Sequence, residues 1–438
     1  MSTADASTPH AGSSSAPSGP EHDATAAAQT AHTPHASGPT PSPAQVSPVS
    51  WIYLAVCAVL VSLNLRTLYS SLSAILPEVT AATGLSGAGV TVLTTVPVTL
   101  LGVFAPLAPV LARRIGAWQV LFVAMLLLTV GMLIRALPPF GSAPLATLLT
   151  GTVISGLAIA LSNVVLPSIV KQDFRNHIGL MSGLYTTCVA GSAAFGAALT
   201  FPALESSGSW NIALGLWALP ALAVAGLLIP VILRHRSRAH LATSTSGRSP
   251  MTSAIAWQIT VMMVFQSMMS FPIFAWLAPI LRERGMDGTA AGLVIALNVL
   301  LQMSGSLVAP ILAARIRSQS LLNASMALLT GIGWVLCIIG PLEGVWVWAA
   351  LLGLGQGSLT ALALTMISLR SHSTHMALRV SGMMQGLGYG LGSAGTLLVG
   401  QILTATGDFT PVATLFAATS LACAVFGWLA GRPRLIQE

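Results

Sequence analysis

The sequence predicts an all-α integral membrane protein with twelve transmembrane helices arranged as two six-helix repeats. Three observations support this prediction: an almost uncharged composition, a regular succession of long apolar segments, and short motifs that recur at a near-constant spacing. Of the 438 residues, 54% are hydrophobic and only 7% are charged. Soluble domains carry roughly a quarter charged residues, so this composition excludes an ordinary soluble protein.

Long apolar segments follow one another from Trp51 almost to the end of the chain. Each can cross the roughly 30 Å hydrocarbon layer of a bilayer as a helix. Backbone amides must all be paired in lipid, which leaves helices or closed barrels, and these segments are far longer than the ~10-residue strands of a barrel. We therefore expect helical spans near residues 51–76, 88–111, 118–138, 145–170, 178–203, 211–233, 254–281, 289–314, 319–340, 345–369, 379–405 and 411–430.

The predicted spans divide the chain into five parts. Residues 1–49 are rich in Ala, Ser, Thr, Pro, Gly and His and contain no Lys or Arg, which is typical of a disordered tail. The tail lacks the basic and apolar regions of a secretory signal. An N-terminal half at 50–233 and a C-terminal half at 251–432 follow, joined by a polar, basic linker at 234–250, and residues 433–438 form a C-terminal tail.

The distribution of basic residues predicts the orientation in the membrane. Of the 18 Lys and Arg residues, only Arg135, Arg282 and Arg284 fall on one side of the predicted helices, and Arg66 falls within a span. All the others fall on the opposite side, which the positive-inside rule makes cytoplasmic. We expect a multi-pass protein of the cytoplasmic (inner) membrane with both termini in the cytoplasm. This pattern also explains the net charge of +7 better than nucleic-acid binding does.

The two halves resemble each other in sequence. Ala108–Ala112 (APVLA) matches Ala309–Ala313 (APILA) at an offset of 201 residues. Three further matches share an offset of 199: Ser182-Gly183 with Ser381-Gly382, Lys171 with Arg370, and Gly208 with Gly407. Parallel six-helix repeats of this kind describe the major facilitator architecture, whose substrate site lies between the halves near the bilayer midplane.

Arg66 is the only charge deep within a predicted span. On a helix it shares a face with Tyr69, three residues later. No carboxylate is expected in the membrane to neutralise it, so two roles remain open. It either donates to backbone carbonyls of another span, or it binds an anion, since a guanidinium can hold a planar oxyanion in bidentate fashion. We favour the anion site.

Neutral polar side chains recur at mid-depth in several other spans. Asn298 and Gln302 are i, i+4 neighbours on the eighth span, and Gln385 and Tyr389 are the same on the eleventh. Such groups either bind a small polar solute or link helices to one another, at about 0.6 kcal/mol per contact on average. The sequence leaves both roles open. With Arg66 and Tyr69, the candidate substrate-binding residues are these four together with Asn163, Tyr185, Gln266 and Gln356.

The sequence contains no machinery for catalysis or for binding a metal or cofactor. It has no HExxH, no GxSxG and no paired carboxylates, so we do not expect an enzyme. The cysteines Cys57, Cys188, Cys337 and Cys423 lie in apolar spans without metal-ligand spacing. All Asp and Glu residues are assigned to the tail, loops or span ends. Glu78, beyond the first span, is the nearest candidate for proton coupling, and we expect it in a loop.

Several stretches resemble the cyanate/nitroimidazole transporter branch of the major facilitator superfamily. They are Asn64-Leu65-Arg66, LPEV (76–79), TTVPVTLLGVFAPLAPVLARRIG (94–116), GLMSGLYTT (179–187), LGLWALPAL (214–222), AWLAPILRERG (275–285), LGLGQGSLTALALTMISLRS (352–371) and SGMMQGLGYGLGSAG (381–395). The resemblance implies twelve helices, alternating access, small anionic or polar heteroaromatic solutes, and Arg66 as a cavity residue. The wider superfamily has an acidic residue at the position of Arg113, so a gating salt bridge built on that acid is not expected here.

The sequence therefore predicts a secondary carrier for a small anionic or polar solute, acting as a monomer in membrane lipid and without nucleic acid. One alternative is an efflux carrier of broader specificity, suggested by four methionines on the seventh span: Met262, Met263, Met268 and Met269. These methionines also suit plain packing. Another alternative is a membrane sensor that binds a solute without transporting it, although the chain has no added signalling domain.

Overall fold

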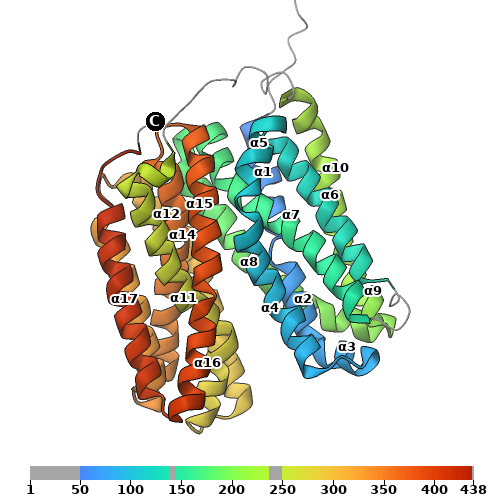
Figure 1. The fold of residues 1–438 in the computed structure, drawn as a ribbon, viewed down its shortest axis with the longest axis vertical. Helices are drawn as coiled ribbons and strands as arrows, with labels where there is room; N and C mark the ends of the chain where they lie inside the picture. The colour runs from blue at the N-terminus through green and yellow to red at the C-terminus, as the bar shows by residue number, and fades with distance from the viewer. Residues whose placement is uncertain (1–49, 138–143, 236–248, 437–438) are drawn as a thin grey trace, which may run out of the picture. The chain divides into compact units, whose positions relative to one another are not determined.

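The described part of the chain is helical almost throughout (Figure 1). This computed structural model describes residues 50–137, 144–235 and 249–436. The expected N-terminal tail and most of the expected linker therefore fall outside the described residues. Within the described residues, the secondary structure agrees with the all-α prediction.

The first part of the described chain forms ten α-helices. They are α1 (Trp51–Ser62), α2 (Thr67–Ala74), α3 (Leu76–Thr83), α4 (Gly87–Phe104), α5 (Leu107–Ile115), α6 (Ala117–Arg135), α7 (Pro144–Asp173), α8 (Ile178–Ser207), α9 (Trp210–Gly215) and α10 (Ala218–His235). The second part forms seven, which are α11 (Ala254–Glu283), α12 (Gly288–Arg315), α13 (Ser320–Ile339), α14 (Val345–Arg370), α15 (Thr374–Gly392), α16 (Ala394–Thr406) and α17 (Thr410–Ala430).

Most of these helices are long and apolar enough to cross a membrane. Among the described residues, ten helices or continuous helix runs meet that condition, and α4 with α5, bent by 54°, makes an eleventh. The remaining predicted span, 379–405, corresponds to α15 and α16, which meet at Ser393. The observed helices thus correspond to all twelve predicted spans.

The bend between α4 and α5 follows from a proline. Pro106 precedes α5 and has no backbone N–H, and in a continuous helix its ring would clash with the carbonyl of Gly102. Gly102 is also where α15 passes closest, because a Cβ atom built there would lie 2.9 Å from the Cα of Gly390. The bend therefore occurs where this helix touches the second part of the chain.

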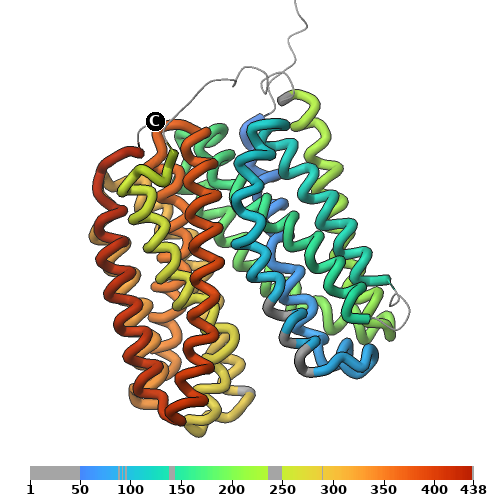
Figure 2. The backbone as a smooth tube through the Cα atoms, in the orientation of Figure 1, coloured from blue at the N-terminus to red at the C-terminus, as the bar shows by residue number. Residues whose placement is uncertain are grey.

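Contacts between the first and second parts gather toward the end of the bundle where α1 begins and α17 finishes, which we call the terminal end. The Ser381 hydroxyl on α15 donates to the Val164 carbonyl on α7 at 2.7 Å. Closer to the terminal end, the Ser368 hydroxyl donates to the Pro167 carbonyl at 2.9 Å. Toward the opposite end, near α3 and α16, the two sets of helices diverge, as the ribbon and the backbone tube both show (Figures 1 and 2).

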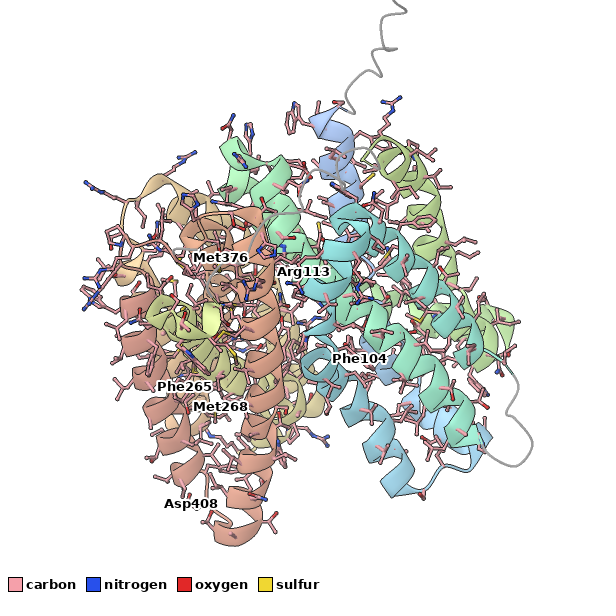
Figure 3. The ribbon with its side chains drawn as sticks, turned by 45° about the horizontal axis from the view of Figure 1, so that its top comes forward. Phe104, Arg113, Phe265, Met268, Met376 and Asp408 are labelled. Carbon is pink, nitrogen blue, oxygen red and sulfur yellow. The ribbon has the colours of Figure 1, made fainter. Side chains whose placement is uncertain are left out.

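The repeated motifs meet across this contact region. A Cβ atom on Gly183 of α8 would lie 2.6 Å from the Leu307 carbonyl oxygen of α12. At the matching position, a Cβ on Gly382 of α15 would lie 2.7 Å from Cγ of Pro109 on α5. Each repeat therefore uses a glycine to bring its helix against a helix of the other repeat. Figure 3 labels Arg113 and Met376, which mark the neighbouring ends of α5 and α15.

A second pair of matched glycines ends equivalent helices. Gly208 follows α8 and Gly407 follows α16, each with φ of 64° and each donating its N–H to the carbonyl four residues back. Such a left-handed cap is strained for residues with a Cβ atom. The sequence offset of 199 residues therefore corresponds to the same local geometry in both parts.

Arg370 joins three segments at the terminal end. Its buried guanidinium donates to the side-chain carbonyl of Gln319, at the start of α13. It also donates to the Gly431 carbonyl beyond α17, at 2.7 Å. The Arg370 carbonyl accepts from the Ile436 N–H at 2.8 Å, which ties down the end of the described chain. One side chain thus holds α13, α14 and the end of α17 together.

The Arg370→Ala variant is expected to unfold at a lower temperature than the unmodified protein. The side-chain oxygen of Gln319 would lose its donor, whereas the Gly431 carbonyl would keep the N–H of Gln319 and the hydroxyl of Ser318. An unsatisfied buried polar group costs about 1–3 kcal/mol. Thermal unfolding of the purified protein in detergent measures the effect. Arg317→Ala is the matched control, since Arg317 is exposed at the same end and its loss should change the stability by no more than about 0.5 kcal/mol. Equal unfolding midpoints for the two variants would contradict the role given to Arg370.

Candidate functional site

Arg66 lies at a break in the first span, between α1 and α2. The backbone N–H groups of Asn64 and Leu65 bond carbonyls three residues back, at 3.0 and 3.2 Å, so the helix tightens there. The Asn64 side chain also donates to the Leu60 carbonyl at 2.8 Å, and such local bonds compete with regular helix. The span that the sequence predicts as continuous is therefore interrupted at its charged residue.

The backbone of Arg66 is anchored while its side chain is left available. Its N–H donates to Oγ of Ser192 on α8 at 3.1 Å, and its carbonyl accepts from the Ser70 hydroxyl at 3.1 Å. The side chain is half-buried, and no described residue forms a hydrogen bond or ion pair with its guanidinium. The alternative in which Arg66 donates to carbonyls of another span is therefore not seen among the described residues.

The Ser192→Ala variant tests the anchor of this break. The Ser192 hydroxyl is fully buried and donates to the Val189 carbonyl at 2.7 Å while accepting from Arg66. Without it, a buried N–H has no partner, at a cost of about 1–3 kcal/mol. We expect a lower midpoint of thermal unfolding than for Ser162→Ala. Ser162 is equally buried but bonds only the Ala158 carbonyl of its own helix. A midpoint for Ser192→Ala at or above that of Ser162→Ala would contradict the anchor.

Two tyrosines lie near Arg66, and a third lies near one of them. The hydroxyls of Tyr69 on α2 and Tyr389 on α15 are close enough to interact electrostatically with the charge of Arg66, and Tyr185 on α8 is close enough to interact with Tyr389. The ring of Tyr389 packs against Phe271 with centroids 6.1 Å apart. One cation, several hydroxyl groups and aromatic faces thus come together from both parts of the chain. This set of groups suits a small solute that carries negative charge or a delocalised π-system.

Two buried oxygen atoms beside these groups have no hydrogen-bond partner among the described residues. They are the Tyr185 hydroxyl and the side-chain carbonyl of Gln385. The Gln385 amide nitrogen crosses between the two parts of the chain and donates to the backbone carbonyl of Asn163 and to the Ser381 hydroxyl, both at 2.9 Å. Asn163 is half-buried, and its own amide donates to the Ile159 carbonyl at 3.0 Å. The unpaired oxygens are able to accept hydrogen bonds from a bound solute or water.

Gln266 and Gln356 lie together inside the second part of the chain. Both are buried, and the amide nitrogens of both donate to the Thr360 hydroxyl, at 2.5 and 3.3 Å. The Gln356 amide also lies 3.4 Å from the Gln266 carbonyl. These amides link α11 with α14, which is the interhelical role that the sequence left open.

Asn298 and Gln302 form a second internal pair. Asn298 is completely buried and donates to the Ala349 carbonyl on α14 at 2.9 Å, while its side-chain oxygen accepts from Gln302 at 2.7 Å. Gln302 itself is half-buried. The contact between Asn298 and Gln302 that the sequence predicts is present, but Asn298 also joins α12 to α14.

Sequence reasoning missed two residues near the site and misplaced a third. Ser192 gave no signal, because a serine within an apolar span is common. Arg135 was expected at the non-cytoplasmic end of the third span, and it does end α6, but the sequence did not indicate that it is buried. Glu78 was expected in a loop, but it lies in the first turn of α3, with a buried oxygen that has no partner.

The methionines of the seventh span serve as packing residues in this structure. Met262, Met263 and Met269 are buried, and a Cβ atom on Gly388 of α15 would meet the side chain of Met263. Met268, labelled in Figure 3, is half-buried. The methionines therefore do not form a continuous exposed apolar face for a drug-like solute. Among the described residues, no group of three or more His, Cys, Asp or Glu is arranged to hold a metal ion.

The chain is similar in sequence to a known family and to characterised transporters. Residues 54–394 match the family described as Major Facilitator Superfamily. The chain is 33% identical over 392 residues to the 2-nitroimidazole transporter of Escherichia coli (strain K12), which covers 88% of this chain and 97% of that protein. It is 28% identical over 351 residues to the cyanate transport protein CynX of the same organism, covering 80% of this chain and 90% of the other.

The chain also resembles a further transporter in sequence and a solved transporter structure in fold. The chain is 32% identical over 392 residues to the uncharacterised transporter YycB of Bacillus subtilis (strain 168), covering 88% of this chain and 94% of that one. The solved structure of the proton:xylose symporter XylE matches with a TM-score of 0.65 at 14% identity, over 87% of this chain and 94% of XylE. At that identity the structural match concerns the fold alone, and it confirms the predicted twelve-helix architecture.

Proposed function

We propose that the transported solute is a small anion, on the premise that this chain belongs to the Major Facilitator Superfamily. The family match and the transporters among its relatives make the chain a secondary transporter of small solutes and not an enzyme. It is likewise a multi-pass membrane protein. The proposal adds the charge class of the solute and the side chains that bind it.

The observation that carries the proposal is the guanidinium of Arg66. It stands at a helix break with no hydrogen bond or ion pair to a described residue, and an uncompensated charge in a membrane is costly. An anion bound there would neutralise the arginine and accept two parallel N–H bonds. One relative is named for cyanate, an anion, and another for 2-nitroimidazole, whose nitro group also presents oxygen acceptors.

The neighbouring residues are proposed to select a small, flat or linear solute. The hydroxyls of Tyr69, Tyr185 and Tyr389 would donate hydrogen bonds, and the aromatic faces would favour a planar π-system. The unpaired side-chain oxygen of Gln385 would accept a bond from any N–H on the solute. Polar groups on both sides of a solute give it contacts with both halves of the transporter. The buried amides of the second half are proposed to support this site without touching the solute.

The direction in which this site opens follows from the proposed orientation. The basic residues that gather at the terminal end favour a cytoplasmic position for it and for both termini. The contacts between the halves also lie toward that end. We therefore propose that this arrangement faces outward, and that rocking of the halves opens the cytoplasmic side. We further propose a monomer in the cytoplasmic membrane that contacts lipid and binds no nucleic acid.

Flux measurements in proteoliposomes test the proposal. The purified full-length protein is reconstituted, and uptake is compared for cyanate, nitrate, nitrite, acetate and a neutral heteroaromatic such as 1-methyl-2-nitroimidazole, which has no ionisable N–H. Saturable uptake of at least one small anion above protein-free liposomes is the expected result. Uptake of the neutral compound alone would contradict the anionic assignment while leaving transport intact.

Two other functions are kept as alternatives, and each makes a different prediction. Broad efflux predicts that deletion of the gene sensitises cells to diverse apolar compounds, but the buried methionines of α11 do not favour it. A sensor predicts saturable binding of a solute without flux. Binding without uptake across the whole panel would favour the sensor over the carrier.

A further inference from the structure

A second arginine is buried in the first half, apart from Arg66. Arg135, the last residue of α6, is only 1% exposed. Its Nη1 donates to the Leu68 carbonyl of α2 at 3.2 Å and lies 3.9 Å from Sδ of Met132. Its Nε and Nη2 are buried and have no hydrogen-bond partner. The two unpaired donors lie along one edge of the planar group, which is the arrangement that binds an oxyanion or halide in bidentate fashion.

Arg135 is one of the residues that line a small cavity. It has a volume of about 40 Å³ and is lined by Arg135, Tyr69, Ser73, Thr152 and the apolar side chains of Leu72 and Leu93, among others. The Thr152 hydroxyl is buried and also has no partner among the described residues. Three unpaired hydrogen-bond donors therefore belong to two residues that line one cavity, Arg135 of α6 and Thr152 of α7. Unpaired buried donors of this kind are rare in native proteins and call for an occupant.

The charge of Arg135 determines which kind of occupant fits. No residue that lines the cavity is acidic. Glu78 leaves its own buried oxygen unpaired and forms no ion pair with Arg135. A buried charge without a partner costs several kcal/mol. Water would fit, since one molecule needs about 10–15 Å³ of such volume, but water does not neutralise a guanidinium.

We propose that this cavity is a second anion site, which holds one small inorganic anion of the size of chloride. Nε–H and Nη2–H of Arg135 and the hydroxyl of Thr152 would donate to it. The volume admits a halide or a triatomic anion and is too small for an organic acid as large as gluconate. The bound anion compensates the buried charge and fixes α6 and α7 against α2.

The cavity lies beside the site around Arg66, here called the central site, but is separate from it. Tyr69 lines the cavity with part of its side chain, and its hydroxyl interacts electrostatically with Arg66. The neighbouring Ser73, one helical turn further from Arg66, is exposed. An anion bound at Arg135 would therefore lie on the side of Tyr69 that faces away from the terminal end. There it would help to keep the Tyr69 side chain in position. The site depends only on Arg135 and its cavity, so it does not rest on the proposed solute of Arg66.

Thermal unfolding of the purified full-length protein tests this proposal with chloride as the probe. Samples at constant ionic strength are titrated from sodium gluconate, whose anion is too large for the cavity, into sodium chloride. We expect a saturable rise in the unfolding midpoint for the unmodified protein and for Arg66→Ala. Binding of radiolabelled chloride at equilibrium gives a second readout that is independent of stability.

Variants locate the effect within the molecule. Arg135→Met removes the buried charge with little change of volume and is expected to fold but to lose the chloride response, since a neutral side chain needs no counterion. Thr152→Val is expected to weaken chloride binding about three- to tenfold, the loss of one hydrogen bond. Arg282→Met is the control, because Arg282 is an exposed arginine whose loss should leave the response unchanged.

Three results would overturn the proposal. The first is an absence of any saturable difference between gluconate and chloride in the unmodified protein. The second is a response that survives in Arg135→Met, and the third is one that disappears in Arg66→Ala, which would assign the anion to the central site. Each of these results leaves the flux experiments on the central site unaffected, so failure of this proposal is distinguishable from failure of the proposed transport function.

Discussion

Replacing Arg66 with alanine is expected to reduce uptake of a small anion by about 10- to 100-fold. A hydrogen bond to a charged group contributes about 1.5–3 kcal/mol, and each 1.4 kcal/mol corresponds to a factor of ten in affinity. The guanidinium of Arg66 has no hydrogen bond or ion pair with a described residue that would be lost in the variant. The loss should therefore appear in solute binding, as a raised KM for uptake into proteoliposomes, with little change in thermal stability.

Arg66→Lys separates charge from geometry at the same position. Lysine keeps the positive charge but offers a point-like ammonium in place of a planar fork of donors. We expect this variant to retain more anion uptake than Arg66→Ala and less than the unmodified protein. Arg317→Ala serves as the control, because it removes an exposed arginine far from the helix break. Full uptake of the transported anion in both Arg66 variants would show that Arg66 does not bind the solute.

Gly183→Val is expected to reduce uptake at least about tenfold, while the protein still inserts into the membrane. A Cβ atom on Gly183 would lie 2.6 Å from the Leu307 carbonyl oxygen, which is backbone and cannot rotate away. The larger side chain therefore prevents α8 and α12 from meeting as they do here. Since alternating access requires the halves to close at one end and then at the other, the variant should be held with its terminal end apart.

Thiol labelling measures whether the terminal end is held apart. The Thr187 hydroxyl donates to the Met303 carbonyl at 3.3 Å across the same contact. A cysteine at Thr187, in a background without Cys188, should react faster with a small thiol reagent when Gly183→Val is present. Gly292→Ala is the matched control on α12, because a Cβ there would meet nothing within 4 Å. Normal uptake and unchanged labelling in Gly183→Val would contradict the closing role of this contact.

The fold was predictable from the sequence because membrane physics limits the choices. Apolar length, the cost of unpaired amides in lipid and the repeat offset together indicated twelve helices in two related sets, and the observed helices match those spans. Interruptions inside spans were not predictable. The break before Arg66 depends on Asn64 bonding a carbonyl of its own helix, and a hydropathy pattern does not register which carbonyl a side chain reaches.

The candidate site was predicted only in part. Arg66 lies near Tyr69 and Tyr389, and Tyr389 lies near Tyr185. Gln266 and Asn298 are equally polar and equally deep in the sequence pattern, yet they bond α14 and not the central region. Depth in a span follows from position along the chain, whereas the direction of a side chain depends on how the helix is rotated against its neighbours.

The sequence by itself indicated a membrane protein of twelve helices in two related sets, with Arg66 as the only charge deep within a predicted span. Those predictions rest on composition, apolar segments and the repeat offset, and the first two express the cost of placing charge and unpaired backbone in lipid. Only the tertiary structure decided that Arg66 stands at a helix break held by Ser192 and that Arg135 is buried beside a cavity. Burial at the end of a helix depends on what packs against it, and that information lies in residues distant in the sequence, such as Leu68 and Thr152.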